Sequence, residues 1–145
     1  MSSILLLNLI ISFIAVGLIW TIQLVHYPTM RFISEKKFTD FHNFHSKRIS
    51  ILAIPIMSIE LLTSFLLFYQ NYHLDSYIFA TNFTLVILIW ISTFLIQVPM
   101  HNILSLAKND KVLNRLILSN WIRTILWSVR SILMTFYLAH TFKLI

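Results

Sequence analysis

Two arginines lie inside a stretch of the chain that is otherwise apolar enough to cross a lipid bilayer. The stretch runs from Leu116 to Leu138 and contains Arg123 and Arg130. A charged side chain at the bilayer centre costs from about 2.5 to more than 10 kcal/mol, so a chain keeps one there only where other groups compensate. Steps of three and four residues return to the same face of an α-helix. We therefore expect one polar stripe that faces other helices, made of Asn120, Arg123, Trp127 and Arg130.

The composition of the chain indicates an integral membrane protein. Of 145 residues, 58% are hydrophobic and 11% are charged, whereas a soluble domain has about 45–50% apolar and about 25% charged residues. The apolar residues gather in four blocks, each long enough to cross a bilayer as an α-helix. The sequence therefore predicts a single transmembrane domain over residues 1–145, an all-α four-helix bundle of up-down-up-down topology. The predicted helices cover about residues 4–25, 49–69, 77–98 and 116–138.

The connection between the first two predicted helices contains a further helical pattern. Phe38, His42 and His45 follow one another in steps of four and three residues, so they share a helix face. We expect an amphipathic helical extension that leads into the second membrane helix.

Two prolines limit the neighbouring helices. Pro28 favours an extended residue before it and the end of a helix or a kink, and Pro55 favours a kink.

Positive charge is distributed unevenly among the predicted loops. The loops at 29–48 and 100–115 carry five and three Lys or Arg residues, and the loop at 70–76 carries none. Because basic loops of membrane proteins stay on the cytoplasmic side, we expect a multi-pass protein of the cell membrane with both termini outside the cytoplasm. The net charge of +6 therefore belongs to membrane topology. No soluble basic face is left for a nucleic acid partner.

This topology brings several polar side chains to similar depths. Counted at about 1.5 Å per residue from the cytoplasmic edge, Arg123 lies at about 10 Å, Glu60 at about 16 Å and Arg130 at about 21 Å. We expect Glu60 to pair with both arginines, leaving about one positive charge for an anionic ligand or a lipid headgroup. Uncharged polar residues would lie near this cluster at the cytoplasmic side, namely Gln23, Gln97 and Asn120.

Four histidines fall at the same predicted membrane face: His26, His42, His45 and His101. Imidazole nitrogens bind zinc or copper, and a pair of them can hold a haem iron. The absence of cysteine excludes thiolate ligands and iron–sulfur clusters. A haem or a transition metal on these histidines stays open as a cofactor, beside the simpler interpretation that interfacial histidines bind headgroups and loop carbonyls. No residue is assigned a catalytic role.

A few short motifs of the chain resemble those of known small membrane proteins. They are Trp20-x-x-Gln23-x-x-His26-Tyr27-Pro28, then Pro99-x-His101, then Asn120-Trp121-x-Arg123-Thr124 followed by Arg130. The set looks like uncharacterised four-helix bacterial membrane proteins, and the layout is distantly similar to the anthrone-oxygenase-like membrane family. This likeness implies oxidation of a hydrophobic aromatic substrate without a well-defined cofactor, and no site residue is carried over from it.

Together these residues favour a binding function. We expect a small amphipathic or anionic ligand in a polar pocket at the cytoplasmic leaflet, with a lipid or a quinone-like molecule as candidates. Two alternatives stay open: a membrane oxidoreductase that uses haem, a metal or a quinone-like substrate, and a structural or assembly subunit of a membrane complex. A homo-oligomer also stays open. The expected ligand-binding residues are Arg123, Arg130, Glu60, Asn120, Gln23 and Gln97.

Overall fold

A computed structural model describes residues 3–71 and 76–141, and nearly all of them are helical. The described part of the chain contains no β-strand, which confirms the predicted all-α class. In chain order the helices are α1 (Ser3–Thr21), α2 (Tyr27–Thr29), α3 (Glu35–Gln70), α4 (Ser76–Ser92), α5 (Val98–Leu104) and α6 (Asp110–Thr141). Three short turns complete the helical segments: π-helical turns at Ile22–His26 and Thr93–Gln97, and a 3₁₀ turn at Met30–Phe32.

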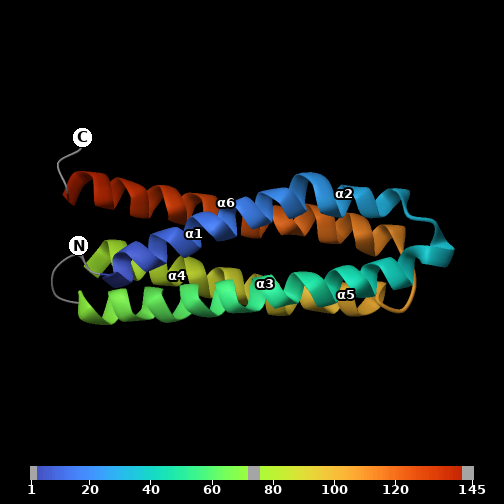
Figure 1. Ribbon diagram of the computed structural model, residues 1–145, viewed down its shortest axis with the longest axis horizontal. Coiled ribbons are helices and arrows are strands. Elements are labelled where there is room, and N and C mark those ends of the chain that lie inside the picture. The colour runs from blue at the N-terminus through green and yellow to red at the C-terminus, as the bar shows by residue number, and fades with distance from the viewer. Residues whose placement is uncertain (1–2, 72–75, 142–145) are drawn as a thin grey trace.

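The helices form a bundle of four long helical stretches (Figure 1). α1 packs against α3 and α6, and α4 packs against the same two helices. The loops at 33–34 and 105–109 lie at one end of the bundle, at the right of Figure 1. We call this the basic end, because Arg31, Lys36 and Lys108 lie in or beside the two loops. The predicted loop at 70–76 falls largely on residues 72–75, outside the described residues.

Three helical stretches are long and apolar enough to cross a membrane: Ser3–Phe32, Glu35–Gln70 and Tyr77–Leu104. The fourth predicted span lies in α6, which is a continuous helix but is not among the three. The physical reason is the polar stripe itself, since the buried face of α6 carries Asn120, Arg123, Thr124, Arg130 and Ser131. The helix therefore exists as predicted, whereas its apolarity is lower than in the other three stretches.

α3 joins two predicted segments into one helix. It contains both the amphipathic extension and the second predicted membrane helix, and it continues through Pro55 without ending there. Its N-terminal part buries Phe38, His42 and His45, the three residues that the spacing puts on one face. The predicted extension is thus part of the bundle rather than a separate surface helix.

Pro28 and Pro99 are each preceded by a π-helical turn. The Tyr27 N–H donates to the Ile22 carbonyl, and the Val98 N–H donates to the Thr93 carbonyl, five residues back in each case. A proline ring clashes with the carbonyl four residues before it in a regular α-helix, and the wider turn relieves that clash. Tyr27 has φ −63° and ψ −44°, which is helical. The prediction of an extended residue before Pro28 is therefore wrong, because the chain widens its turn instead of leaving the helix.

Three apolar clusters follow one another along the length of the bundle, with polar layers between them. The cluster at the basic end has fully buried members from four elements, and we call it the basic-end cluster. It includes Met30, Phe38, Leu104, Leu113 and Leu116. A second cluster lies in the middle of the bundle around Ile19 and Trp127. The third lies toward the far end around Phe79 and Met134. Close packing of this kind holds helices together in a membrane, and the polar layers lie between the clusters.

Candidate functional site

Arg130 is completely enclosed, with no exposed surface. Its guanidinium makes five hydrogen bonds that reach all three other long helices. It donates from Nε to Asn82 Oδ1 (2.8 Å), from Nη1 to Ser12 Oγ (2.9 Å) and to Glu60 Oε1, and from Nη2 to Asn8 Oδ1 (2.9 Å) and Ser64 Oγ (3.1 Å). A guanidinium has five N–H donors, so this arrangement leaves Arg130 no donor for a ligand.

Glu60 balances the charge of Arg130. The two side chains form a salt bridge, and both are almost fully buried. The second carboxylate oxygen, Oε2, accepts a hydrogen bond of 2.7 Å from Trp127 Nε1. Both oxygens of Glu60 are thus occupied. A buried ion pair whose remaining groups are all hydrogen-bonded is stable where an incomplete one would be costly.

Arg123 has a different environment, although it is two helical turns away on the same helix. It is 8% exposed, its guanidinium donates three hydrogen bonds to uncharged oxygens, and the Tyr27 hydroxyl interacts with it as well. Nε and Nη2 donate to Asn120 Oδ1, and Nη1 donates to Thr93 Oγ1 over 3.4 Å. The ring of Trp127 lies 5.9 Å from the guanidinium carbon. No carboxylate of residues 3–71 or 76–141 forms an ion pair with Arg123.

Of the two ion pairs in the predicted Arg123–Glu60–Arg130 cluster, the one between Glu60 and Arg130 is confirmed and the one between Glu60 and Arg123 is wrong. Glu60 pairs with Arg130, whereas Arg123 has no bond to it among the described residues. Counting depth along ideal helices put Glu60 midway between the arginines, but a height on a helix does not say which way a side chain extends. The carboxylate of Glu60 is used completely by Arg130 and Trp127.

A chain of amides orients Arg123. Gln23 Nε2 donates to the Ile117 carbonyl (3.2 Å), and Gln23 Oε1 accepts from Asn120 Nδ2 (2.7 Å). This fixes Asn120 with its Oδ1 toward Arg123. Gln97 lies on the other side, where it accepts from Ser92 (3.2 Å) and donates to the Ser119 carbonyl (3.4 Å). Gln23 lies within the first π-helical turn and Gln97 ends the second, so the two turns direct both amides at α6.

Arg123 lines a cavity of about 460 Å³. A volume of this size is typical of a site for a small organic ligand. Apolar walls come from all four helical stretches, among them Ile19, Met57, Trp90 and Trp127. Polar groups at its wall are Arg123, Tyr27, Thr93, Gln97, His45, His101, Ser46, Ser50 and Asn102. Ser46 Oγ and Trp90 Nε1 are enclosed and have no hydrogen-bond partner among the described residues. The cavity thus combines apolar walls with a cation and several other polar side chains.

The four histidines lie together beside this cavity. His42 Nε2 and His101 Nδ1 are 3.0 Å apart, and His101 Nε2 is 3.0 Å from the Tyr27 hydroxyl. His26 stacks on His45 with ring centroids 3.7 Å apart. The ring contacts and hydrogen bonds join α2, α3 and α5 and hold the Tyr27 hydroxyl at the wall of the cavity.

The histidine geometry does not form a metal site. Within the described ranges, no group of three or more His, Asp or Glu side chains is arranged to hold a metal ion. Both ring nitrogens of His101 are taken by hydrogen bonds to His42 and Tyr27. In addition, His26 and His45 face each other with their ring planes rather than with their nitrogens. Metal ligation by His26, His42, His45 and His101 therefore has no support in their arrangement.

Several residues of these two sites have no counterpart in the sequence analysis. They are Asn8, Ser12, Ser64 and Asn82 around Arg130, and Thr93, Ser46 and Trp90 at the wall of the Arg123 cavity. A usable signal existed for the first group: single polar residues interrupt apolar blocks, and Asn8 and Ser12 are spaced to share a helix face. Nothing in the sequence distinguishes the second group, since Thr, Ser and Trp are common in membrane helices.

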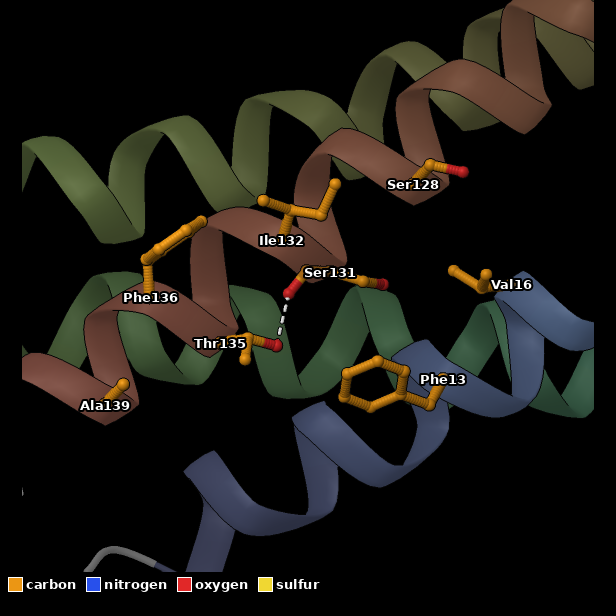
Figure 2. A pocket seen from close by; sticks show the side chains of 8 residues that line it. All are labelled: Phe13, Val16, Ser128, Ser131, Ile132, Thr135, Phe136 and Ala139. Atoms are coloured by element: carbon orange, nitrogen blue, oxygen red, sulfur yellow. Dashed lines mark hydrogen bonds between the residues drawn. The ribbon is translucent and has the colours of Figure 1, made fainter. Parts of the chain in front are cut away.

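A second hollow lies on the outer surface between α1 and α6 (Figure 2). It encloses about 480 Å³, and its walls include Phe13, Val16, Ile132 and Phe136. The Thr135 hydroxyl, also at the wall, donates a hydrogen bond of 2.7 Å to the Ser131 carbonyl of its own helix. This satisfies the hydroxyl locally, and the hollow offers a ligand almost only apolar contact.

No family model, no curated protein and no solved structure matches this chain. The motif resemblance to four-helix bacterial membrane proteins and to the anthrone-oxygenase-like family therefore stays a prediction. The geometry of the Arg123 cavity is the feature of the molecule that indicates a function.

Proposed function

We propose that the protein binds a small amphipathic ligand in the Arg123 cavity, with an anionic or hydrogen-bond-accepting head group beside the guanidinium. The observation that carries the proposal is Arg123 itself, a buried cation without a carboxylate partner in the described chain, at the wall of a 460 Å³ cavity. A buried charge is costly unless it is paired. A negatively charged or strongly accepting ligand group would supply the missing partner.

The proposal gives the two arginines different tasks. Arg130, with five protein hydrogen bonds and Glu60 beside it, joins the helices. This moves Arg130 and Glu60 from the expected ligand-binding set to the bundle interior. Arg123 remains in that set, with Asn120 and Gln23 as the amides that orient it and Gln97 at the wall of the same cavity. A purely structural subunit accounts for Arg130, but it does not explain the cavity or an Arg123 that has no carboxylate partner within residues 3–71 and 76–141.

The membrane setting is part of the same proposal. α6 crosses the bilayer with the three apolar stretches, because its polar stripe faces the bundle interior. The basic end faces the cytoplasm by the positive-inside rule, so the Arg123 cavity lies in the half of the membrane next to it. An oxidoreductase that acts on a quinone-like substrate would use the same cavity, and it stays an alternative.

Native mass spectrometry of the detergent-purified protein tests the proposal. We expect a retained small molecule on the wild type, lost in Arg123→Gln and kept in Arg115→Gln, which alters an exposed arginine of the same helix. Loss from both variants, or retention by both, would contradict a role for Arg123. A wild-type protein that neither retains a molecule nor binds an added amphiphile saturably would contradict the proposal as a whole.

A further inference from the structure

The exposed part of the cavity wall lies on one side of the bundle. Three apolar residues that line the cavity are exposed. Ile54 lies on α3 and is 61% exposed, whereas Phe94 in the second π-helical turn and Val98 at the start of α5 are 55% and 38% exposed. By contrast, the lining residues Ala15 and Ile19 on α1 are buried, at 1% and 2%. The cavity therefore opens between α3 and the segment formed by the second π-helical turn and α5. We call this opening the α3–α5 portal.

The ends of the bundle are closed to the cavity. Toward the loops, the basic-end cluster fills the space with side chains that have no exposed surface, such as Phe38, Leu104 and Leu116. Toward the far end, Trp127 and the network around Arg130 block the interior. A ligand cannot reach Arg123 along the bundle axis without unpacking one of these layers. The apolar side chains at the α3–α5 portal face outward from the bundle, where a bilayer supplies acyl chains rather than water.

We infer that the occupant is a single-chain lipid anion that enters sideways from the bilayer through the α3–α5 portal. The head group is a carboxylate or a phosphate held by Arg123 at the cavity wall. The chain leaves between Ile54 and Phe94. This inference rests on the proposed ligand-binding function and narrows it to one ligand class.

Charge and size both select this class. Arg123 is a cation with no carboxylate partner in the parts of the chain described, so an anionic oxygen completes it better than a neutral one. The cavity of about 460 Å³ accommodates a head group and part of one chain. Ile54, Phe94 and Val98 make the portal mainly apolar, and Asn102 of α5 is an exposed polar side chain of the same wall. A free fatty acid and a single-chain alkyl phosphate share this chemistry.

Tryptophan fluorescence gives a local readout. The chain has four tryptophans. Trp90 and Trp127 line the cavity, whereas Trp20 and Trp121 pack against each other elsewhere with ring centroids 5.6 Å apart. A Trp20→Phe/Trp121→Phe protein therefore reports on the cavity alone. The probes are bromoundecanoate and its neutral counterpart bromoundecanol, because bromine quenches tryptophan only at close range.

We expect saturable quenching by bromoundecanoate and affinity for bromoundecanol that is weaker by about tenfold or more, the value of one hydrogen bond to a charged group. Arg123→Gln should abolish the preference for the acid, and Arg115→Gln should keep it. Competition by laurate and by dodecyl phosphate then distinguishes a carboxylate-headed from a phosphate-headed natural ligand. An equal affinity for acid and alcohol in the reporter protein would overturn the anion assignment.

Two bulky substitutions test the portal. Ala53→Phe, at the cavity wall on α3, should slow association of bromoundecanoate in stopped-flow measurements by roughly tenfold. Leu52→Phe, on the exposed neighbour that does not line the cavity, should leave the rate unchanged. Equal rates in the two variants would overturn the sideways route.

Decylubiquinone also quenches tryptophan. It distinguishes a failure of the lipid-anion class from a failure of the proposed binding function. Saturable binding of decylubiquinone without binding of bromoundecanoate would uphold the proposed binding function and overturn the lipid-anion class. If neither compound binds saturably, the proposed function fails together with the inference.

Discussion

Arg123 and Arg130 lie seven residues apart on one face of α6, and the protein treats them in opposite ways. Arg130 has five protein partners, a carboxylate among them, and no exposed surface. Arg123 has three bonds to uncharged oxygens and lines a cavity. The comparison shows that a buried charge by itself does not identify a function. What matters is whether the surrounding protein already satisfies it.

The largest expected effect comes from Arg130→Leu. The substitution leaves Glu60 as a buried charge without its partner, which costs about 3–5 kcal/mol of unfolding free energy. Unfolding in mixed micelles, followed by circular dichroism, measures the loss. A loss below about 1 kcal/mol, the size typical of an exposed ion pair, would contradict the enclosed network.

Double-mutant cycles separate the two arginines more sharply. Arg130→Leu with Glu60→Leu should be less destabilising than the sum of the single changes, with a coupling of up to about 3 kcal/mol, because the second change removes the stranded charge. Arg123→Leu with Glu60→Leu should be additive, since the two side chains do not bond. Coupling of Glu60 to Arg123 rather than to Arg130 would reverse the assignment made from the geometry.

Trp127→Phe should have an intermediate effect, because this residue contacts both sites. Its Nε1 donates to Glu60, and its ring lies near Arg123. Phenylalanine keeps a ring but removes the N–H, which leaves one carboxylate oxygen unsatisfied at a cost of about 1–3 kcal/mol. The same unfolding measurement in mixed micelles checks this value. The matched change Trp121→Phe, in a half-exposed ring, should cost less.

Arg123→Gln should change stability least, by about 1 kcal/mol or less in either direction. Glutamine can still bond Asn120, and the substitution removes an uncompensated buried charge. We expect the Arg123→Gln protein to unfold with a free energy close to that of the wild type and to lose the retained ligand. A destabilisation as large as that of Arg130→Leu would mean that Arg123 also holds the helices together.

The spacing of apolar and polar residues predicted the helices and the polar stripe of α6, because both depend only on the order of residues along the chain. It indicated that Asn120, Arg123, Trp127 and Arg130 face inward, and all four are buried. It could not decide the partner of Glu60, since that choice depends on the rotation of α3 against α6. It also put the two arginines into one cluster because depth was the one coordinate that the sequence supplied. The partners of Arg130 on α1 and α4, such as Asn8 and Asn82, come from rotations that no local pattern records.

The π-helical turns before Pro28 and Pro99 determine which of the residues that follow them in the chain face the interior of the bundle. Each residue of an α-helix advances the face by about 100°, so removing one residue from a turn would rotate everything after it by that angle. Deleting a residue between Ile22 and His26 would then direct Tyr27 away from the cavity while α1 and its apolar surface stayed helical. A distant relative shorter by one residue at this point would thus lose the arrangement of the site, and its packing at the basic end would change because Met30 rotates together with Tyr27. When such sequences are aligned, a gap at either proline carries more information about ligand binding than a substitution elsewhere in the helix.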